Sequence, residues 1–481
     1  MRQGILDFLS NSEVNNVAEN YMPTSPTGHR PGIRLAVRVT CPHCWNNFPP
    51  DRVLWIAQHP DLTGDPRLGA DQALRFLPTR FNVEGSAIDS RGFACHGLAC
   101  PNCHLPIPRA LFEMEPMFIS ILGAPACGKS YFLASMTWQL RQVLPKHFAL
   151  MFSDADPISN HRLHEYEELQ FLNPDPNALV AIEKTATQGD LYDTVLFGDQ
   201  AISFPRPFMF TLKPAESHPN HAAAGRLSRV LCLYDNAGES FLPGQDTAIS
   251  PVTRHLALSR CLLFLFDPTQ DPRFRRACQG KSQDPQMQDR LQRFQREMPV
   301  RQETILLEAA HRVRRYTGIP EKAKHSRPLI LVVTKHDSWS TLLDGGRLNP
   351  PWIGNSKGDL CAMQLDTIDE VSKKLRALLW KLCPEIVSAA ESFAEQVIYM
   401  PVSATGRSPE VDPKTGAFGV RPRDMNPMWA ETPLLYVLSR FVEGLVPYRR
   451  PTVPTAIPLP GGNVLPPPFA RSKSAAAEGT A

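Results

Sequence analysis

The sequence predicts an α/β protein in which a small β module precedes a main domain with a mainly parallel sheet and helices on both faces. Three observations support this prediction. From Met117 onward, apolar runs of strand length alternate with helical patterns. Most of these runs are almost continuously apolar, which is typical of strands buried on both faces. Upstream of them, five of the eleven cysteines fall between Cys41 and Cys103, which indicates a separate metal-binding module.

Shifts in composition divide the chain into four parts. Residues 1–35 are polar, contain prolines and lack sustained periodicity, so we expect a loose arm. The cysteine module occupies 36–110 and the α/β domain occupies 116–447. Residues 448–481 are rich in proline and alanine and contain few large apolar side chains. They cannot bury enough surface to fold, and we expect a disordered tail.

The strands of the main domain are expected, in chain order, at 117–122, 207–213, 229–234, 261–266, 329–333 and, more weakly, 396–400. A helix is expected at 365–382 because its apolar residues recur on one stripe. A second helix is expected at 432–445, with Thr432 as its cap and Pro433 at its first position.

Composition and charge exclude several classes of protein. Hydrophobic residues make up 42% of the 481 residues and charged residues 21%, which excludes a wholly disordered chain. No apolar run approaches the ~20 residues that span a bilayer. Asp7 interrupts the apolar N-terminal stretch, so we expect a cytoplasmic protein that contacts no membrane. The net charge is +3, and residues 448–481 alone hold four basic residues and one acidic residue. The remainder is neutral, which argues against a general nucleic-acid binder.

A glycine-rich loop, Gly123-Ala-Pro-Ala-Cys-Gly-Lys-Ser130, follows the first strand and precedes a helical pattern. This is the phosphate-binding pattern G-x-x-x-x-G-K-[ST] in the strand–loop–helix context that it requires. Its backbone N–H groups would wrap a phosphate, Lys129 would neutralise β- and γ-phosphate charge, and Ser130 would bind Mg²⁺. The predicted nucleotide contacts in this segment also include Gly123, Ala126, Cys127, Gly128 and Tyr131.

Three later stretches indicate the base and the γ-phosphate contacts. Asp235-Asn-Ala-Gly238 matches D-x-x-G, in which the carboxylate helps to hold Mg²⁺ and the glycine N–H reaches the γ-phosphate. Thr334-Lys335-His-Asp337 matches [NT]-K-x-D, in which the carboxylate accepts the ring N–H and exocyclic amine of guanine. Adenine offers no such donors on that edge. Ser403-Ala404 matches the loop that packs over the base.

All four stretches follow apolar strands in the required order. The chain from about Met117 to Leu445 therefore resembles the translation-factor-related (TRAFAC) class of P-loop GTPases. With cysteine pairs in front, it is also similar to the zinc-ribbon-bearing double-GTPase family of predicted bacterial conflict systems. The class implies GTP and Mg²⁺, with Lys129, Gly238 and Glu239 as catalytic residues. Glu239 stands where Ras-like members have a water-positioning glutamine, so we expect slow or partner-dependent hydrolysis.

Two features of this predicted GTPase have alternative interpretations. The first-switch ligand of Mg²⁺ is Thr194 or Ser203, since both precede the strand at 207–213. The insertion 273–315 carries eleven basic and five acidic residues, a net charge of +6. It is either a solvated helical face, or a docking surface for an acidic partner, or the source of an arginine for the site.

Two short cysteine pairs, Cys41-Pro-His-Cys44 and Cys100-Pro-Asn-Cys103, predict a structural zinc site with four thiolates. The segment between them, 45–99, is longer than usual, so we expect a β-rich insertion there. Alternative zinc ligands nearby are Cys95, His96 and His104. Residues 41–104 carry five basic and six acidic side chains, which favours a structural or protein-docking role over nucleic-acid binding.

The leading hypothesis is a Mg²⁺-dependent, GTP-hydrolysing switch in a bacterial conflict or signalling system, with a protein partner or effector. The alternative is a protein-interaction scaffold that nucleotide stabilises, with little or no hydrolysis. Nucleic-acid binding through the cysteine module is a third hypothesis, which the charge count disfavours.

Overall fold

The computed structural model describes residues 35–182, 192–235, 254–287, 301–343, 347–354, 360–414 and 416–449. The predicted arm, apart from its last residue, and the predicted tail beyond Arg449 lie outside these residues, as do Gly238 and Glu239. Within the described part, no helix has both the length and the apolar character needed to cross a membrane.

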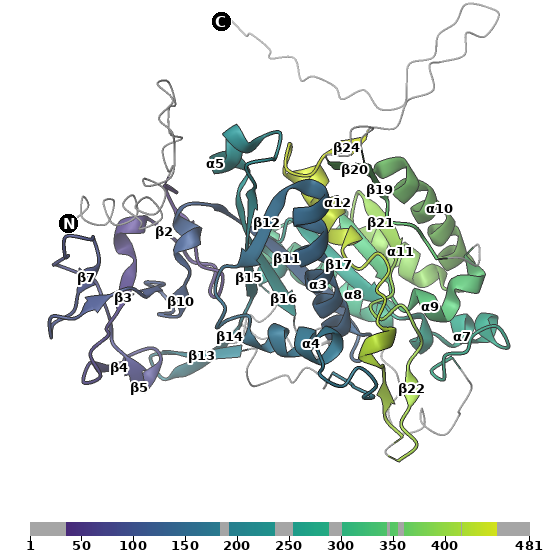
Figure 1. The fold of residues 1–481 in the computed structure, drawn as a ribbon, viewed down its shortest axis with the longest axis horizontal. Helices are drawn as coiled ribbons and strands as arrows, with labels where there is room; N and C mark the ends of the chain where they lie inside the picture. The colour runs from purple at the N-terminus through teal and green to yellow at the C-terminus, as the bar shows by residue number, and fades with distance from the viewer. Residues whose placement is uncertain are drawn as a thin grey trace, which may run out of the picture.

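A seven-stranded mixed sheet forms the centre of the main domain, in the order β12-β15-β16-β11-β17-β18-β21 (Figure 1). Strand β11 pairs in parallel with β16 and β17, and the parallel arrangement continues through β18 to β21. Strand β15 is antiparallel to both β12 and β16. All six expected strands are present, and β12 adds an edge strand that the sequence did not predict. The bounds are β11 Glu115–Gly123, β12 Leu150–Asp154, β15 Phe208–Pro214, β16 Arg229–Asp235, β17 Cys261–Phe266, β18 Leu329–Val333 and β21 Val397–Pro401.

The α-helices and the small strands of the main domain surround this sheet. The helices are α3 Lys129–Phe148, α4 His161–Phe171, α5 Ala224–Leu227, α6 His255–Leu258, α7 Pro272–Cys278, α8 Gln302–Thr317, α9 His336–Trp339, α10 Leu365–Leu382, α11 Pro384–Phe393 and α12 Thr432–Phe441. The strands are β13 Tyr192–Phe197, β14 Gln200–Pro205, β19 Trp352–Gly354, β20 Cys361–Gln364, β22 Glu410–Val411, β23 Phe418–Gly419 and β24 Tyr448–Arg449. The helix expected at 365–382 is confirmed with the same bounds.

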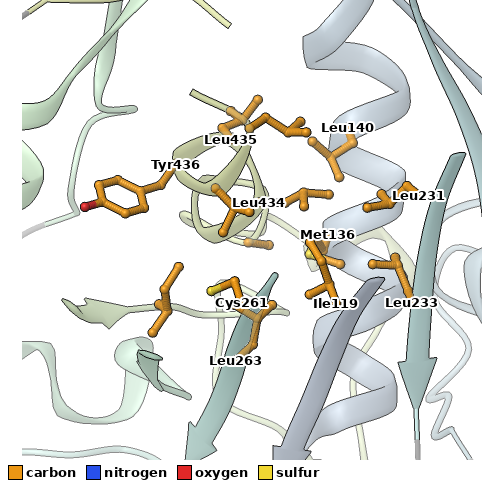
Figure 2. Packing of buried hydrophobic residues seen from close by; sticks show 14 of the residues in the cluster. Ile119, Met136, Leu140, Leu231, Leu233, Cys261, Leu263, Leu434, Leu435 and Tyr436 are labelled. Atoms are coloured by element: carbon orange, nitrogen blue, oxygen red, sulfur yellow. The ribbon is translucent and has the colours of Figure 1, made fainter. Parts of the chain in front are cut away.

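Alternate residues of the central strands face two different cores, as the period of two in a strand requires. On one face, Met136 of α3 and Leu434 of α12 meet around Ile119 and Leu263 (Figure 2). On the other face, Phe264 of β17 packs with apolar residues of α8, α10 and α11. Helices therefore cover both faces of the sheet, as the sequence predicts.

The cysteine module forms a third core on the second face of the sheet. Its residues Val39 and Phe112 are buried together with Phe118 of β11 and Val230 of β16. Leu122 lies on the same side of β11 as Phe118 but belongs to the helical core, so the module and the helices share one face. The strands of the module are β1 Val39–Thr40, β2 Asn47–Phe48, β3 Leu54–Ile56, β4 Thr63–Asp65, β5 Gly69–Ala73, β6 Arg75–Phe76, β7 Ala87–Ile88, β8 Ala94–Cys95, β9 Leu98–Ala99 and β10 Pro106–Ile107. Strands β2 to β9 lie between the cysteine pairs, so the segment 45–99 is rich in short strands.

Helix α12 begins at Thr432, the residue that the sequence analysis expected to be its N-cap. Glu431 is the N-cap, Thr432 is the first helical residue and Pro433 the second, and the helix ends at Phe441 rather than near Leu445. Glu431 is only 5% exposed, and burial raises the pKa of its carboxyl to about 7. The folded protein thus holds a proton on Glu431 at pH values where the unfolded chain has released it.

This proton gives a testable pH dependence. The contribution of Glu431 to stability is fully present below pH 4.5, its ordinary pKa, and falls as the pH rises to about 7. Replacing Glu431 with glutamine is expected to stabilise the fold at pH 8 by about 3 kcal/mol, with little change at pH 4. Thermal unfolding at both pH values measures this effect, with the exposed Glu370→Gln variant as the control. An equal shift in Tm at both pH values would contradict it.

Candidate functional site

The glycine-rich loop connects β11 to the N-terminus of α3. Gly128 is the N-cap of α3 and has a left-handed backbone, with φ of 90°. A Cβ atom at Gly128 would meet no heavy atom within 4 Å, whereas one at Gly123 would lie 2.7 Å from Cys127 Sγ. The loop therefore packs closely at its start and leaves space beside the first turn of α3. The N–H groups at such a helix start are donors for an anion.

Lys129 places a buried positive charge inside this loop. Its side chain is 6% exposed, and Nζ donates to the carbonyl oxygens of Gly123 and Ala124 at 3.1 and 3.0 Å. Cys127 is also buried, which raises the pKa of its thiol. Cys127 thus acts as a packing residue in the loop, and Lys129 is the cation.

Ser130 and Asp235 lie together at the end of two adjacent strands. The Ser130 hydroxyl donates to Oδ2 of Asp235 at 3.1 Å, and β16 brings Asp235 alongside Ile121 of β11. Oδ1 of Asp235 is buried and accepts no hydrogen bond from any residue that the structure describes. Burial raises the pKa of Asp235 against the opposing effects of Lys129 and Ser130. A buried carboxylate oxygen beside a hydroxyl fits the oxygen ligands that Mg²⁺ prefers.

Asp337 and Ser403 come together from two other strand ends. The Ser403 hydroxyl donates to Oδ1 of Asp337 at 2.5 Å, and the Ser408 hydroxyl donates to Oδ2 at 3.2 Å. Burial raises the pKa of Asp337. The Ser338 hydroxyl also donates to Oδ2 at 3.4 Å, so the carboxylate accepts hydrogen bonds from three hydroxyl donors. The same carboxylate oxygens can accept hydrogen bonds from the N–H donors on one edge of a base.

Two links hold these segments against the glycine-rich loop. Lys335 Nζ lies 2.7 Å from a carboxylate oxygen of Asp267, whose neighbour Gln270 donates to the carbonyl of Pro125 at 3.0 Å. The Ser135 hydroxyl of α3 donates to the carbonyl of Ala404 at 2.7 Å. The predicted phosphate and base segments are therefore joined once through Asp267 and Gln270 and once by a direct hydrogen bond.

These segments line one cavity of about 300 Å³. Of the predicted nucleotide contacts, Gly123, Asp235 and Ser403 do not line it but form hydrogen bonds with residues that do. Gly238 and Glu239 stay predictions outside the described residues. The predicted residues that line the cavity are Ala126, Cys127, Gly128, Lys129, Ser130, Tyr131, Thr334, Lys335, Asp337 and Ala404.

The cavity also contains residues that the sequence analysis missed. Thr405 and Arg407 follow Ala404 in the same loop. Their position directly after the Ser-Ala pattern is the sequence signal that could have identified them. Asp284 comes from the insertion 273–315, and its carboxylate accepts from the Ser338 hydroxyl next to Asp337. Only the tertiary fold brings Asp284 to the Asp337 end of the cavity.

Other predicted residues lie apart from this cavity. Thr194 and Ser203 face each other across the β13–β14 hairpin, whose apolar residues pack in the core of the cysteine module. Neither lines the cavity. In the insertion 273–315, Arg273 pairs with Glu385 and Arg312 with Glu308. Part of the positive charge of this insertion is therefore neutralised by ion pairs within the protein. None of its described arginines lines the cavity.

The four predicted zinc ligands form a buried cluster. Their sulfur atoms all lie within 4.8 Å of one another, with Cys41 to Cys103 at 3.8 Å and Cys44 to Cys100 at 3.7 Å. A tetrahedral zinc ion with bonds of about 2.3 Å separates its sulfur ligands by about 3.8 Å. Burial raises the pKa of the Cys41 and Cys103 thiols, whereas hydrogen bonds with the other cysteines, first Cys100, lower the pKa of Cys44. A bound cation would hold all four as thiolates.

The two cysteine pairs have the same local geometry. Trp45 and His104, which follow them, both have left-handed backbones, with φ of 58° and 62°. Each also donates its N–H to the first cysteine of its pair. Two of the alternative ligands have other partners, since Cys95 Sγ contacts the carbonyl of Phe93 and His104 Nδ1 lies 2.9 Å from Asp65. The third, His96, is exposed and lies outside the four-sulfur cluster. The geometry fits a tetrahedral metal held by the four predicted cysteines.

Comparisons with known proteins give one partial relationship. No protein-family model matches the chain. The chain is 24% identical over 248 residues to a curated protein of Mycolicibacterium smegmatis (strain ATCC 700084 / mc(2)155) described as "Putative ESX-1 scaffolding and assembly protein SaeC". The match covers 47% of this chain and 57% of the relative, so it spans little more than half of that protein.

Proposed function

We propose that this chain is a guanine-nucleotide-binding protein of the P-loop GTPase type, in which Mg²⁺ and GTP occupy the cavity beside α3. One observation carries the proposal. The glycine-rich loop, the Thr334–Asp337 segment and the Ser403–Ala404 segment, which are far apart in sequence, line or adjoin one cavity. If the three short patterns had arisen by chance, they would not be expected to lie around one cavity.

The side chains of the cavity suit a phosphate chain at one end and a base at the other. Lys129 and the start of α3 supply positive charge and N–H donors for phosphates. Ser130 and Asp235 supply oxygen ligands for Mg²⁺, which would neutralise phosphate charge when bound. Asp337 supplies the acceptor that separates guanine from adenine.

The arrangement of the strands supports the TRAFAC assignment within this proposal. The loop-bearing strand β11 lies between β16, which ends in Asp235, and β17. Strand β18 leads to Asp337 and its neighbour β21 leads to Ser403. Ligands of open α/β sheets bind at the carboxyl ends of the strands, where all of these residues lie. We further propose that the cysteine module holds a structural zinc ion.

A nucleotide-stabilised scaffold is the second candidate function. The specific observation in its favour is the partial similarity to the protein described as a putative ESX-1 scaffolding and assembly protein. A scaffold of this kind would use nucleotide to hold its fold and would bind protein partners through its outer surfaces. The switch would hydrolyse GTP, whereas the scaffold would bind it with little or no hydrolysis.

Binding and turnover of the purified full chain test both functions. GTP and ATP are added separately with Mg²⁺, and binding and phosphate release are measured for each. Selective GTP binding with slow phosphate release is expected of the switch. Selective binding without release, also in the presence of partner proteins, would favour the scaffold, and a preference for ATP would contradict the guanine assignment.

Replacing Asp337 with asparagine is expected to weaken GTP binding by a hundredfold or more. The amide presents a donor toward the exocyclic amine of guanine, so one hydrogen bond of the base is left unmade in a buried site. Xanthosine triphosphate has a carbonyl at that position and is expected to bind this variant better than GTP. Affinities for both nucleotides measure the effect, with the exposed Asp366→Asn variant as control. An unchanged preference for GTP would refute the role of Asp337.

A further inference from the structure

One buried tyrosine links the cysteine cluster to the carboxylate beside the nucleotide cavity. Tyr234 is the penultimate residue of β16 and directly precedes Asp235. Because successive side chains of a strand point to opposite faces, Tyr234 lies in the core of the cysteine module while Asp235 meets Ser130 of α3. The cysteine module and the proposed Mg²⁺ site therefore lie on opposite sides of the same short stretch of backbone.

The tyrosine hydroxyl is held by the first cysteine pair. It donates to the carbonyl oxygen of Pro42 at 2.6 Å and accepts from the indole N–H of Trp45 at 3.2 Å. Pro42 lies between Cys41 and Cys44, and Trp45 follows them, so both partners belong to the turn that would wrap the metal. Tyr234 is fully buried, and both hydrogen bonds are shielded from water.

A histidine holds the other side of the tyrosine ring. The ring of His255 stacks on that of Tyr234, with ring centres 4.3 Å apart and planes at 10°. His255 Nδ1 lies 2.5 Å from the hydroxyl of Ser120, which is the register partner of Tyr234 on β11. The end of β16 is thus fixed between the cysteine turn and the strand that leads into the glycine-rich loop.

We propose that Tyr234 is a positioning residue that couples metal binding at the four cysteines to Mg²⁺-dependent GTP binding through Asp235. This inference rests on the proposed function. The metal fixes the turn that contains Pro42, the turn fixes Tyr234, and the backbone then fixes the adjacent Asp235. Because coupling between two binding sites is reciprocal, Mg²⁺ with GTP also raises the affinity of the cysteines for zinc.

The test uses Tyr234→Phe, which keeps the stacked ring and removes only the hydroxyl. The matched control is Tyr399→Phe, because Tyr399 is also buried in the sheet but donates to Glu391, on α11. Trp45→Phe removes one of the two hydrogen bonds of the Tyr234 hydroxyl, from the side of the cysteine turn, and serves as the test variant if Tyr234→Phe does not fold. Zinc content and circular dichroism establish that each full-length variant is folded and loaded with metal.

Two quantities are measured. The first is the Mg²⁺ concentration that gives half-maximal GTP binding, and the second is the zinc affinity in competition with a chelating dye, with and without Mg²⁺ and GTP. Tyr234→Phe and Trp45→Phe are expected to need about tenfold more Mg²⁺. GTP binding without added Mg²⁺ stays the same, since Lys129 and Asp337 are untouched. The increase in zinc affinity caused by Mg²⁺ and GTP is expected in the wild type and in Tyr399→Phe, and to be lost in the other two variants.

The outcomes separate this inference from the proposed function. If the wild type binds GTP and all variants share its Mg²⁺ requirement and its zinc response, the coupling is wrong and the nucleotide site stands. If the wild type binds no GTP at any Mg²⁺ concentration, the proposed function fails and the coupling fails with it.

Discussion

Replacing Lys129 with alanine is expected to lower the affinity for GTP at least a hundredfold. The lysine ammonium is the buried cation of the glycine-rich loop, and it donates to two carbonyl oxygens of the loop at 3.1 and 3.0 Å. A hundredfold loss corresponds to about 2.7 kcal/mol, which is modest for one charge against a triphosphate in a partly dry cavity. Removing the lysine also takes away an interaction that lowers the pKa of Asp235, so the variant is expected to bind Mg²⁺ less well.

The control for this prediction lies on the same helix. Lys146, in the last turn of α3, is exposed and does not line the cavity. Lys146→Ala removes the same charge from the chain while leaving the loop intact, so its GTP affinity is expected to match the wild type. Calorimetric titration of GTP into the three proteins measures the difference. Wild-type affinity in Lys129→Ala would mean that nucleotide does not bind beside α3.

The sequence predicted the main elements because each was encoded by a local pattern. The continuously apolar run at 261–266 specifies a strand buried on both faces, and the apolar stripe at 365–382 specifies a helix with the same bounds. The cysteine pairs specified a buried cluster of four thiols because tight turns that present two cysteines need only a short segment. Patterns of this kind can be recognised in a short segment without knowledge of its tertiary contacts.

The parts that the sequence did not predict depend on contacts between distant segments. Asp284 reaches the Asp337 end of the cavity only through the fold, since the residues around it in the sequence match no nucleotide-binding pattern. Thr194 and Ser203 were candidates because of their place before β15, but the hairpin that contains them packs on the cysteine module. The link from Trp45 to Tyr234 spans 189 positions and has no pattern in the sequence at all.

Replacing Cys100 with serine is expected to abolish zinc binding and to destabilise the main domain together with the cysteine module. Zinc binding free energy in such small modules is largely folding free energy. Here the module also buries Phe118 and Val230 on the central sheet, so its loss exposes apolar surface of β11 and β16 to water. One zinc per chain is expected in the wild type and none in the variant, with a fall in Tm of more than about 10 °C.

Cys95→Ser separates the loss of the metal from the loss of a buried thiol. Cys95 is as fully buried as Cys100 and belongs to the same module, but its sulfur contacts a backbone carbonyl and lies outside the four-sulfur cluster. This variant is expected to keep its zinc and most of its stability. If Cys95→Ser lost zinc, or if Cys100→Ser kept it, the set of ligands would be wrong. If Cys100→Ser lost zinc while the Tm stayed within a few degrees, the module would be held on the sheet by its apolar core alone. The metal would then contribute nothing to the fold.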